Sequence, residues 1–214
     1  MVASEAPEGA GGSQVLALCG GKPLVSWSSD AVRQMEATAR VVVALPAGAA
    51  PPEGTIPVTI RDDVVATLEA ALAAAGPADI AILHDPCRPL ADGALFEHAL
   101  RELKEHRCDA VVAGEPITDT LKRVDADGRI TETLPRGEAW RIQTPQVYRA
   151  AVLRRALAVA RRRIEDGRQA PDDPAFVPSC VDGRVRVVGV PRDSVHVRGP
   201  ADMRVAEQLL SAAR

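Results

Sequence analysis

The segment Ile80–Pro89, with the sequence IAILHDPCRP, places polar residues directly behind a short apolar run. The run Ile80–Leu83 predicts a short buried strand, because a few apolar residues bounded by turn-forming ones are typical of such strands. Asp85 and Arg88 follow where this strand ends. In α/β sheets, ligands bind beyond the carboxyl ends of the strands. This segment therefore predicts one strand of an α/β sheet and one wall of a binding site.

The same alternation of apolar strands and helical stretches continues on both sides of this segment. Further strands are expected at 15–18, 40–45, 56–60, 110–113 and 184–190, with a short piece at 195–197. Helices are expected at 25–39, up to 75 from a cap at Asp62 or Asp63, up to about 106 from a cap at Asp92, at 149–166, and from residue 200 onward. This order predicts a mostly parallel sheet covered by helices on both faces, an αβα three-layer, Rossmann-like fold.

Residues 115–142 interrupt the alternation. Two β-like pieces, Thr120–Val124 and Arg129–Leu134, flank a turn that contains Asp127-Gly128, and Asp-Gly between such pieces indicates a β-hairpin. We expect this hairpin to protrude from the body as an arm. A projecting hairpin of this kind is often a dimer arm. The alternative is a solvated excursion with no partner.

Length and composition limit the class of protein. The 214 residues suit one domain, expected at 14–214 behind a flexible tail at 1–13. A net charge of −3 and 2% aromatic residues argue against a nucleic-acid partner. No apolar run reaches membrane-spanning length, and the acidic start does not resemble a signal peptide. Four widely spaced cysteines indicate free thiols in a reducing cytoplasm.

Two clusters carry candidate chemistry on composition alone. Asp85 at a strand end is well placed to hold Mg²⁺ on nucleotide phosphates, and Arg88 to bind an oxyanion. The alternative is that Asp85 only organises its turn and that Arg88 only pairs with it. His196 can face the same cleft, although a lone histidine is more often structural. The arginine-rich helix at 149–166 is interpreted as a solvated face.

Four segments together resemble the 2-C-methyl-D-erythritol 4-phosphate cytidylyltransferase family. His84–Pro89 is similar to the family form His-Asp-Ala-Ala-Arg-Pro, and Asp119–Lys122 is similar to Asp-Thr-φ-Lys. Thr144–Gln146 matches Thr-Pro-Gln, and His196–Asp202 is similar to Lys-Val-Thr-x-Pro-x-Asp. The resemblance implies a nucleotidyltransferase fold and a homodimer joined through the arm. It also implies Mg²⁺-dependent transfer of CMP from CTP to a polyol phosphate of isoprenoid precursor synthesis, with release of pyrophosphate.

The resemblance also implies roles for particular residues. Asp85 would hold the metal or the polyol, and Arg88 the polyol. Thr120 and Arg136 from the arm of a second copy, with Thr144, would bind the substrate phosphate. Asp172 would line the polyol pocket. The remaining candidates are His196 as a catalytic residue, Asp202 as a second metal ligand, and Lys22 and Thr67 as substrate-binding residues.

The chain departs from the family pattern in its phosphate-binding parts. The family places a long Gly-rich loop with two cations behind the first strand, where backbone amides hold the triphosphate. Here the strand at 15–18 runs almost directly into Gly20-Gly21-Lys22-Pro23, so the loop is interpreted as deleted. His196 replaces the tail lysine, and Pro171 replaces the Thr before the acidic pair Asp172-Asp173. These losses predict impaired turnover.

Three functions remain open from the sequence. The first is a working cytidylyltransferase with an abbreviated loop. The second is a non-catalytic relative that binds a phosphorylated ligand or pairs with an intact paralogue. The third is a transferase for another base or polyol, such as ribitol phosphate, since the segment 60–67 keeps only one hydroxyl of the family's cytosine-side motif.

Overall fold

The structure is a computed structural model that describes residues 14–36, 40–168, 181–191 and 194–212. The tail at 1–13 and Asp172 lie outside the described residues. A central four-stranded sheet has the order β10 (Val185–Gly189), β6 (Ala110–Pro116), β9 (Trp140–Arg149), β5 (Ile80–Leu83). β10 runs parallel to β6, while β9 runs antiparallel to both β5 and β6. Three of the four strands therefore point in one direction, as expected for this fold class.

Strand β9 was not predicted. Its sequence WRIQTPQVYR mixes glutamines, arginines and a proline, and so lacks the apolar run or strict alternation that marks a strand. Its pairing with β5 on one side and β6 on the other supplies the backbone hydrogen bonds that local propensity did not indicate. The strand links the arm to the body, and it brings residues 141–146 to the centre of the sheet.

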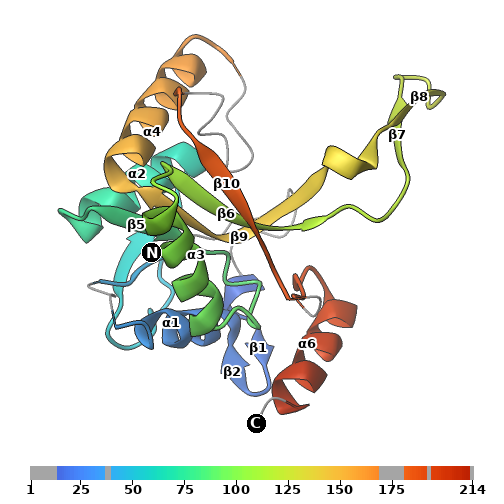
Figure 1. The fold of residues 1–214 in the computed structure, drawn as a ribbon. Helices are drawn as coiled ribbons and strands as arrows, with labels where there is room; N and C mark the ends of the chain where they lie inside the picture. Colours follow the sequence, from blue (N-terminus) through green and yellow to red (C-terminus); the bar gives the residue numbers. More distant parts are fainter. Residues whose placement is uncertain (1–13, 37–39, 169–180, 192–193, 213–214) are drawn as a thin grey trace.

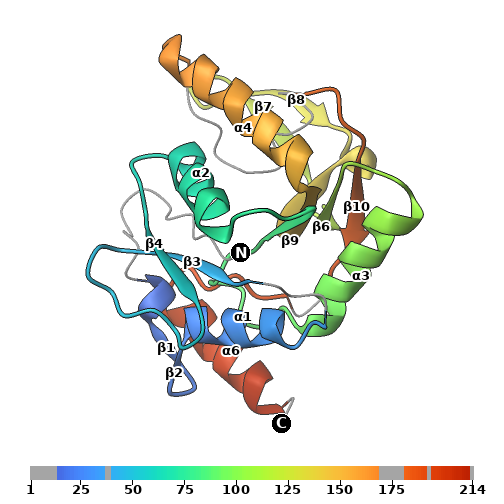
Figure 2. The same ribbon diagram turned by 90° about the vertical axis from the view of Figure 1, so that its left-hand side faces the viewer.

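Helices cover the sheet on both faces (Figures 1 and 2). α2 (Val64–Ala75) and α4 (Ala150–Glu165) pack on one face, with a core that includes Val42, Ala110 and Tyr148. α1 (Leu24–Arg33), α3 (Gly93–Glu105) and α6 (Pro200–Ala212) share the other core, which includes Val43 and Val111. Because neighbouring strand residues point to opposite faces, Val42 and Val43 enter different cores. The predicted αβα three-layer arrangement is thereby confirmed.

Two helix starts follow the predicted caps. The Asp63 carboxylate accepts a hydrogen bond from the Ala66 amide at 2.7 Å, and the Asp92 carboxylate accepts one from the Leu95 amide at 2.9 Å. Each cap satisfies an amide that the helix itself leaves unpaired. α1 ends at Arg33, earlier than the predicted residue 39, because the Met35 amide bonds the Val32 carbonyl and closes a tighter final turn.

The predicted first strand at 15–18 is wrong. Residues Gln14–Leu16 form a short 3-10 turn, η1, and a small hairpin follows, made of β1 (Leu18–Cys19) and β2 (Lys22–Pro23). Gly20 and Gly21 form its turn with φ of +58° and +80°. Two consecutive positive φ angles are characteristic of tight hairpin turns and are accessible at low cost only to residues such as glycine. The predicted strand piece at 195–197 is irregular as well.

A second, two-stranded sheet pairs β3 (Val42–Leu45) with β4 (Ile56–Thr59) in parallel. The arm is a hairpin of β7 (Leu121–Val124) and β8 (Ile130–Leu134), followed by the 3-10 turn η2 (Arg136–Glu138). In Figure 1 it extends away from the body. The Asp125 carboxylate accepts the amides of Asp127 and Arg129 and so closes the turn. Within the described residues, no helix is long and apolar enough to cross a membrane.

Candidate functional site

A cavity of about 470 Å³ lies beyond the carboxyl end of β5, between β6, β9 and the segment that leads into α6. Five residues that the sequence singled out line it: Asp85, Arg88, Thr144, His196 and Asp202. They come from the loop after β5, from β9 and from the last segment of the chain. The structure thus joins three of the motifs that carried the family resemblance in one place.

Three further charged residues line the cavity: Glu115, Arg141 and Arg198. The sequence motifs did not single out Glu115 or Arg141, whereas Arg198 lies within the segment His196–Asp202. Glu115 follows the predicted strand at 110–113, so the rule that ligands meet strand ends was a usable signal. Arg141 had no such signal, because β9 was not recognised as a strand.

Asp85 sits at the floor of the cavity. Its Oδ2 lies 3.0 Å from His196 Nε2, its Oδ1 accepts the Cys87 amide at 2.9 Å, and its own amide donates to Thr144 Oγ1 at 3.0 Å. Burial works to raise the pKa of the Asp85 carboxyl. The hydrogen bond and charge of His196 and the Cys87 amide outweigh burial, so that this pKa lies below its ordinary value. Asp85 is therefore an anion at neutral pH.

Thr144 reaches the cavity because β9 is irregular at that point. Opposite β6, Val112 pairs with Gln146 and Ala113 with Gln143, which leaves Thr144-Pro145 as extra residues. Bulges of this kind redirect side chains next to functional sites. The Thr144 hydroxyl then contacts both the Asp85 amide and His84 Nδ1, the latter at 3.1 Å.

His84 contacts the Thr144 hydroxyl from the interior of the protein. It is buried, and its ring packs edge-on against Phe96 with 5.0 Å between ring centroids. Burial lowers the pKa of the His84 imidazole to about 4. The ring is therefore neutral at pH 7, and it acts as a polar contact for Thr144 rather than as a cation for substrate.

Arg88 is 9% exposed and joins a chain of polar contacts. Its Nη1 donates to Gln143 Oε1 at 2.7 Å. The side-chain Nε2 of Gln143 donates to the Glu115 carboxylate at 2.7 Å, and Arg141 forms an ion pair with the same carboxylate at 2.7 Å. Burial lowers the pKa of Arg88, yet a guanidinium remains charged at neutral pH. The cavity therefore holds a fixed cation whose orientation is set by Gln143.

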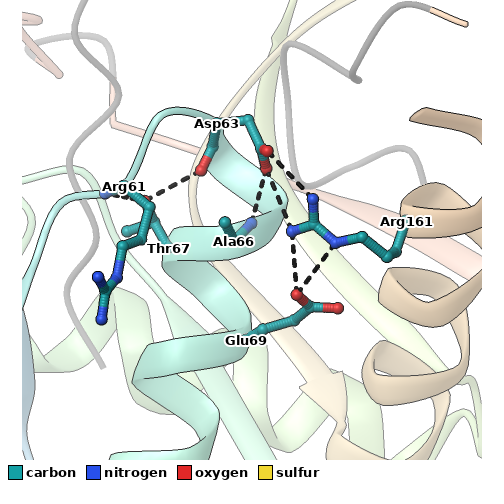
Figure 3. A network of polar contacts seen from close by, with 6 residues as sticks. All are labelled: Arg61, Asp63, Ala66, Thr67, Glu69 and Arg161. Carbon is teal, nitrogen blue, oxygen red and sulfur yellow. Dashed lines mark hydrogen bonds and ion pairs between the residues drawn. The ribbon is translucent and has the colours of Figure 1, made fainter. Parts of the chain in front are cut away.

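Lys22 and Thr67 do not line this cavity. Lys22 pairs with Asp30 and lies 4.4 Å from the Trp27 ring centroid. The Thr67 hydroxyl accepts the Arg61 amide at 2.9 Å and donates to the Asp63 carbonyl at 3.0 Å. Thr67 is thus part of the helix start of α2, as Figure 3 shows.

One arginine of α4, Arg161, belongs to the same network of polar contacts around Asp63. Arg161 pairs with Asp63 at 3.2 Å and with Glu69 at 3.0 Å, and so ties α4 to α2 (Figure 3). The helix was interpreted as a solvated face. Arg161 instead makes a tertiary contact, while Arg154, Arg155 and Arg162 are exposed.

The hairpin at 18–23 lies apart from the cavity, which no described residue of this hairpin lines. The Gly20 amide donates to Glu207 Oε1 of α6 at 3.0 Å, and the Trp27 indole donates to the Cys19 carbonyl at 2.9 Å. The Gly20 amide of this turn is therefore already hydrogen-bonded to the Glu207 carboxylate. The loop was interpreted as deleted on the premise of a first strand at 15–18, which the structure does not contain, so that interpretation stays a prediction.

Thr120 and Arg136 lie on the exposed arm and do not line the cavity of a single chain. Arg136 Nη1 donates to the Thr118 carbonyl near the base of the arm. A contribution of these two residues to the site requires the arm of another copy.

At the cavity, two sets of donors could hold a metal ion. Asp85 and Asp202 offer carboxylate oxygens to the cavity, and Asp202 Oδ2 also accepts the Arg198 amide at 2.9 Å. Separately, ligand atoms of Asp85, Cys87 and His196 all lie within 4.8 Å of one another. The first set suits a hard cation such as Mg²⁺, which prefers oxygen ligands and shares them with substrate phosphates.

The solved structures define the class of protein. The chain matches the crystal structure of 2-C-methyl-D-erythritol 4-phosphate cytidylyltransferase from Thermus thermophilus with a TM-score of 0.77 and 29% identity, over 99% of this chain and 98% of that one. The fold is therefore that of a Rossmann-like nucleotidyltransferase.

The sequence comparisons narrow this class to one family. The family model for 2-C-methyl-D-erythritol 4-phosphate cytidylyltransferase matches residues 9–212. The enzyme of that name from Rhodococcus jostii (strain RHA1) is 33% identical over 198 residues, 89% of this chain and 84% of that protein. The one from Parasynechococcus marenigrum (strain WH8102) is 37% identical over 134 residues, 63% of this chain and 57% of that protein's length. This chain belongs to the 2-C-methyl-D-erythritol 4-phosphate cytidylyltransferase family, as its motifs predicted.

Proposed function

We propose that this chain transfers the CMP group of CTP to the phosphate of a small polyol phosphate of the 2-C-methyl-D-erythritol 4-phosphate type. An oxygen of the substrate phosphate attacks the α-phosphorus of CTP, the bond to the bridging oxygen of the β-phosphate breaks, and pyrophosphate leaves. The observation that carries this proposal is the meeting of Asp85, Arg88 and Thr144 in one cavity, in a chain of this family.

To catalyse this transfer, the protein mainly has to align the two substrates and to neutralise the charge on their phosphates. Arg88, Arg141 and Arg198 supply cations to the cavity wall. The Thr144 hydroxyl, held between the Asp85 amide and His84, offers a neutral contact to a phosphate or polyol oxygen. In this proposal Arg88 binds the polyol phosphate, and its orientation by Gln143 lowers the cost of ordering the side chain on binding.

Nucleotidyltransferases of this family generally use a divalent metal ion. We infer Mg²⁺, with Asp85 as its principal protein ligand and Asp202 as a second carboxylate on the same cavity. Mg²⁺ usually binds one or two carboxylates together with substrate phosphates. When bound, it would neutralise charge on the nucleotide phosphates. Asp85 suits this role because its carboxyl is ionised, although His196 competes for the same oxygen.

The proposal includes a homodimer in which the arm of a second copy brings Thr120 and Arg136 to the substrate phosphate. Both residues are exposed on the arm, and the arm extends away from the body of its own chain (Figure 1). An extended hairpin that buries little surface in its own chain is suited to contact a neighbour.

The hairpin at 18–23 leads us to expect slow turnover of CTP. A helix or loop of free amides normally binds a triphosphate, but here the Gly20 amide already bonds Glu207. By analogy with single donors elsewhere, each missing transition-state contact costs about 3 kcal/mol, or roughly 100-fold in rate. We therefore expect specific but weak catalysis.

The direct test is release of pyrophosphate from CTP and 2-C-methyl-D-erythritol 4-phosphate with Mg²⁺, measured by a coupled assay. ATP, GTP and UTP, and ribitol phosphate as a second acceptor, test the choice of base and polyol. The Asp85→Asn variant is the matched control, since it keeps the shape of the site without its charge. Release no faster than with this variant, for every pair of substrates, would reject the proposed transfer.

A second candidate function is a non-catalytic relative that binds a phosphorylated polyol or pairs with an intact paralogue. The observation that favours it is the two-residue turn at Gly20-Gly21, which lies apart from the cavity. This candidate predicts no thermal protection by CTP with Mg²⁺, whereas a ligand at 100 times its Kd stabilises a protein by about 2.7 kcal/mol. A clear rise in Tm with CTP would contradict it.

A further inference from the structure

We propose that Asp85, Cys87 and His196 form a binding site for a borderline transition-metal dication of the Zn²⁺ or Co²⁺ class, at the wall of the cavity. A carboxylate oxygen, a thiol sulfur and an imidazole nitrogen lie within 4.8 Å of one another there. These are the three ligand types that Zn²⁺ takes in proteins, at about 2.0–2.3 Å from the metal. Binding at such distances would require the three side chains to move closer together.

The backbone already holds these three residues together. The Cys87 amide donates to Asp85 Oδ1 at 2.9 Å, and His196 Nε2 lies 3.0 Å from Asp85 Oδ2. The Val197 amide also donates to the Cys87 carbonyl at 2.8 Å, so the segment that carries His196 is tied directly to the one that carries Cys87. A site whose ligands are positioned before binding loses less conformational entropy when the metal enters.

The burial of the three residues leaves an open coordination position. Cys87 is 5% exposed, whereas Asp85 and His196 line the cavity. A bound ion would therefore have three protein ligands and one position facing the cavity, the arrangement of zinc sites that also bind water or substrate. Binding breaks the contact between His196 Nε2 and Asp85 Oδ2 and forms one bond each from the ion to oxygen, sulfur and nitrogen. It releases to solvent the thiol proton of Cys87 and any proton on the binding nitrogen of His196.

The ligand set selects against Mg²⁺ at these three atoms. Mg²⁺ requires oxygen ligands in an octahedron, whereas thiolate and imidazole favour Zn²⁺, Co²⁺ and similar ions. Cys87 and His196 are also two of the positions where this chain departs from the family motifs His-Asp-Ala-Ala-Arg-Pro and Lys-Val-Thr-x-Pro-x-Asp. Both of these residues lie close to the Asp85 carboxylate. The inference concerns metal binding alone and does not depend on cytidylyl transfer.

Titration of the full chain with Co²⁺, followed by absorption spectroscopy, tests the site without nucleotide. We expect saturation at one equivalent, visible bands of the intensity typical of four-coordinate Co²⁺, and a near-ultraviolet band from thiolate to metal. Zn²⁺ should abolish the spectrum, whereas Mg²⁺ at the same concentration, which competes for Asp85 alone, should not. Absence of a saturable spectrum would overturn the proposal.

Single substitutions test which side chains bind the metal ion. Cys87→Ser should remove the thiolate band, and His196→Ala should weaken Co²⁺ binding more than about tenfold, since even the loss of an outer contact to a metal site costs 10–100-fold. The matched controls are Cys108→Ser, at another buried thiol, and His106→Gln, in a second group of metal-binding side chains with Glu102 and Glu105. Both controls should keep the spectrum.

A thiolate band that survives in Cys87→Ser, or a spectrum lost in His106→Gln, would also overturn the assignment. Circular dichroism of each variant shows whether the fold is retained, and His196 lies in an irregular segment, so its truncation removes no helix or strand. Pyrophosphate release is read separately. A Co²⁺ site in a chain without transferase activity would reject only the proposed function, and activity without a Co²⁺ site would reject only this inference.

Discussion

His196 Nε2 lies 3.0 Å from Asp85 Oδ2, so a residue of the last segment of the chain contacts the carboxylate that follows β5. The contact lowers the pKa of Asp85 against the effect of burial. It also places the tail motif and the strand-end motif on one wall of the cavity. The C-terminal segment is therefore part of the site and not only a covering for the sheet.

Arg88→Ala is expected to reduce kcat/KM about 100-fold or more, because it removes a buried cation directed at the cavity. Arg88→Lys should recover little, since a lysine does not reproduce the planar guanidinium that bonds Gln143. Steady-state kinetics and calorimetric binding of the polyol phosphate measure both effects. Arg155→Ala, an exposed arginine of α4, is the control. Equal affinity of the Arg88→Ala variant for the polyol phosphate would show that Arg88 has no role in binding.

Arg136→Ala should leave the fold nearly intact and weaken binding of the phosphate ligand. The side chain is exposed in the single chain, so its loss costs little stability. Thermal unfolding and calorimetric titration with the polyol phosphate separate the two effects. Arg129→Ala, at another exposed arginine of the arm, should bind like the unmodified chain. Unchanged affinity in Arg136→Ala would show that the arm does not complete a phosphate site.

Asp63→Asn should show a stability loss that depends on pH. Burial works to raise the pKa of Asp63, but the Ala66 amide and Arg161 together lower it more, so the net pKa lies below its ordinary value. A carboxyl with a depressed pKa in the folded chain stabilises it above the unfolded pKa, and this contribution disappears as pH falls through the folded pKa. The variant should be less stable by about 1 kcal/mol at neutral pH, and the deficit should be smaller at about pH 3, below the ordinary pKa of an aspartate.

Urea unfolding at the two pH values measures this difference, provided that both proteins are still folded in the absence of urea at the lower one. Asp62→Asn, at the exposed neighbouring carboxylate, is the control and should show little change. A deficit of the same size at both pH values would mean that the charge of Asp63 is not the cause.

Arg161→Ala should destabilise the chain by about 1 kcal/mol, since it breaks two ion pairs that join α4 to α2. Both pairs are partly buried, and together they place one guanidinium between two carboxylates (Figure 3). Thermal or urea unfolding measures the loss, with exposed Arg162→Ala as the matched control from the next position of α4. Equal stability of the two variants would show that the tie between the helices contributes nothing.

Much of the fold was predictable because its signals are local. Apolar runs marked β3, β5 and β6, Asp63 and Asp92 marked two helix starts, and Asp127-Gly128 marked the arm. β9 was missed because tertiary pairing on both edges, and not its own composition, makes it a strand. The first strand was misjudged because two glycines permit a turn that an apolar run does not reveal.

The candidate site was predictable as a set of motifs and not as a network. Asp85, Arg88, Thr144, His196 and Asp202 were all named from sequence and all line the cavity. Gln143, which orients Arg88 and bonds Glu115, carried no signal because an isolated glutamine is compatible with any surface. Lys22 and Thr67 were named from their type and position, and the structure places them in other contacts.

The sequence by itself determined most of the helices and several of the strands, the arm and the family, because periodicity, turn chemistry and motifs depend on residues close together in the chain. Only the tertiary structure decided that His196 meets Asp85, that Gln143 meets Arg88, and that the hairpin at 18–23 lies outside the cavity. These contacts join residues far apart in sequence. Their distances follow from how the layers pack, and no local pattern encodes them.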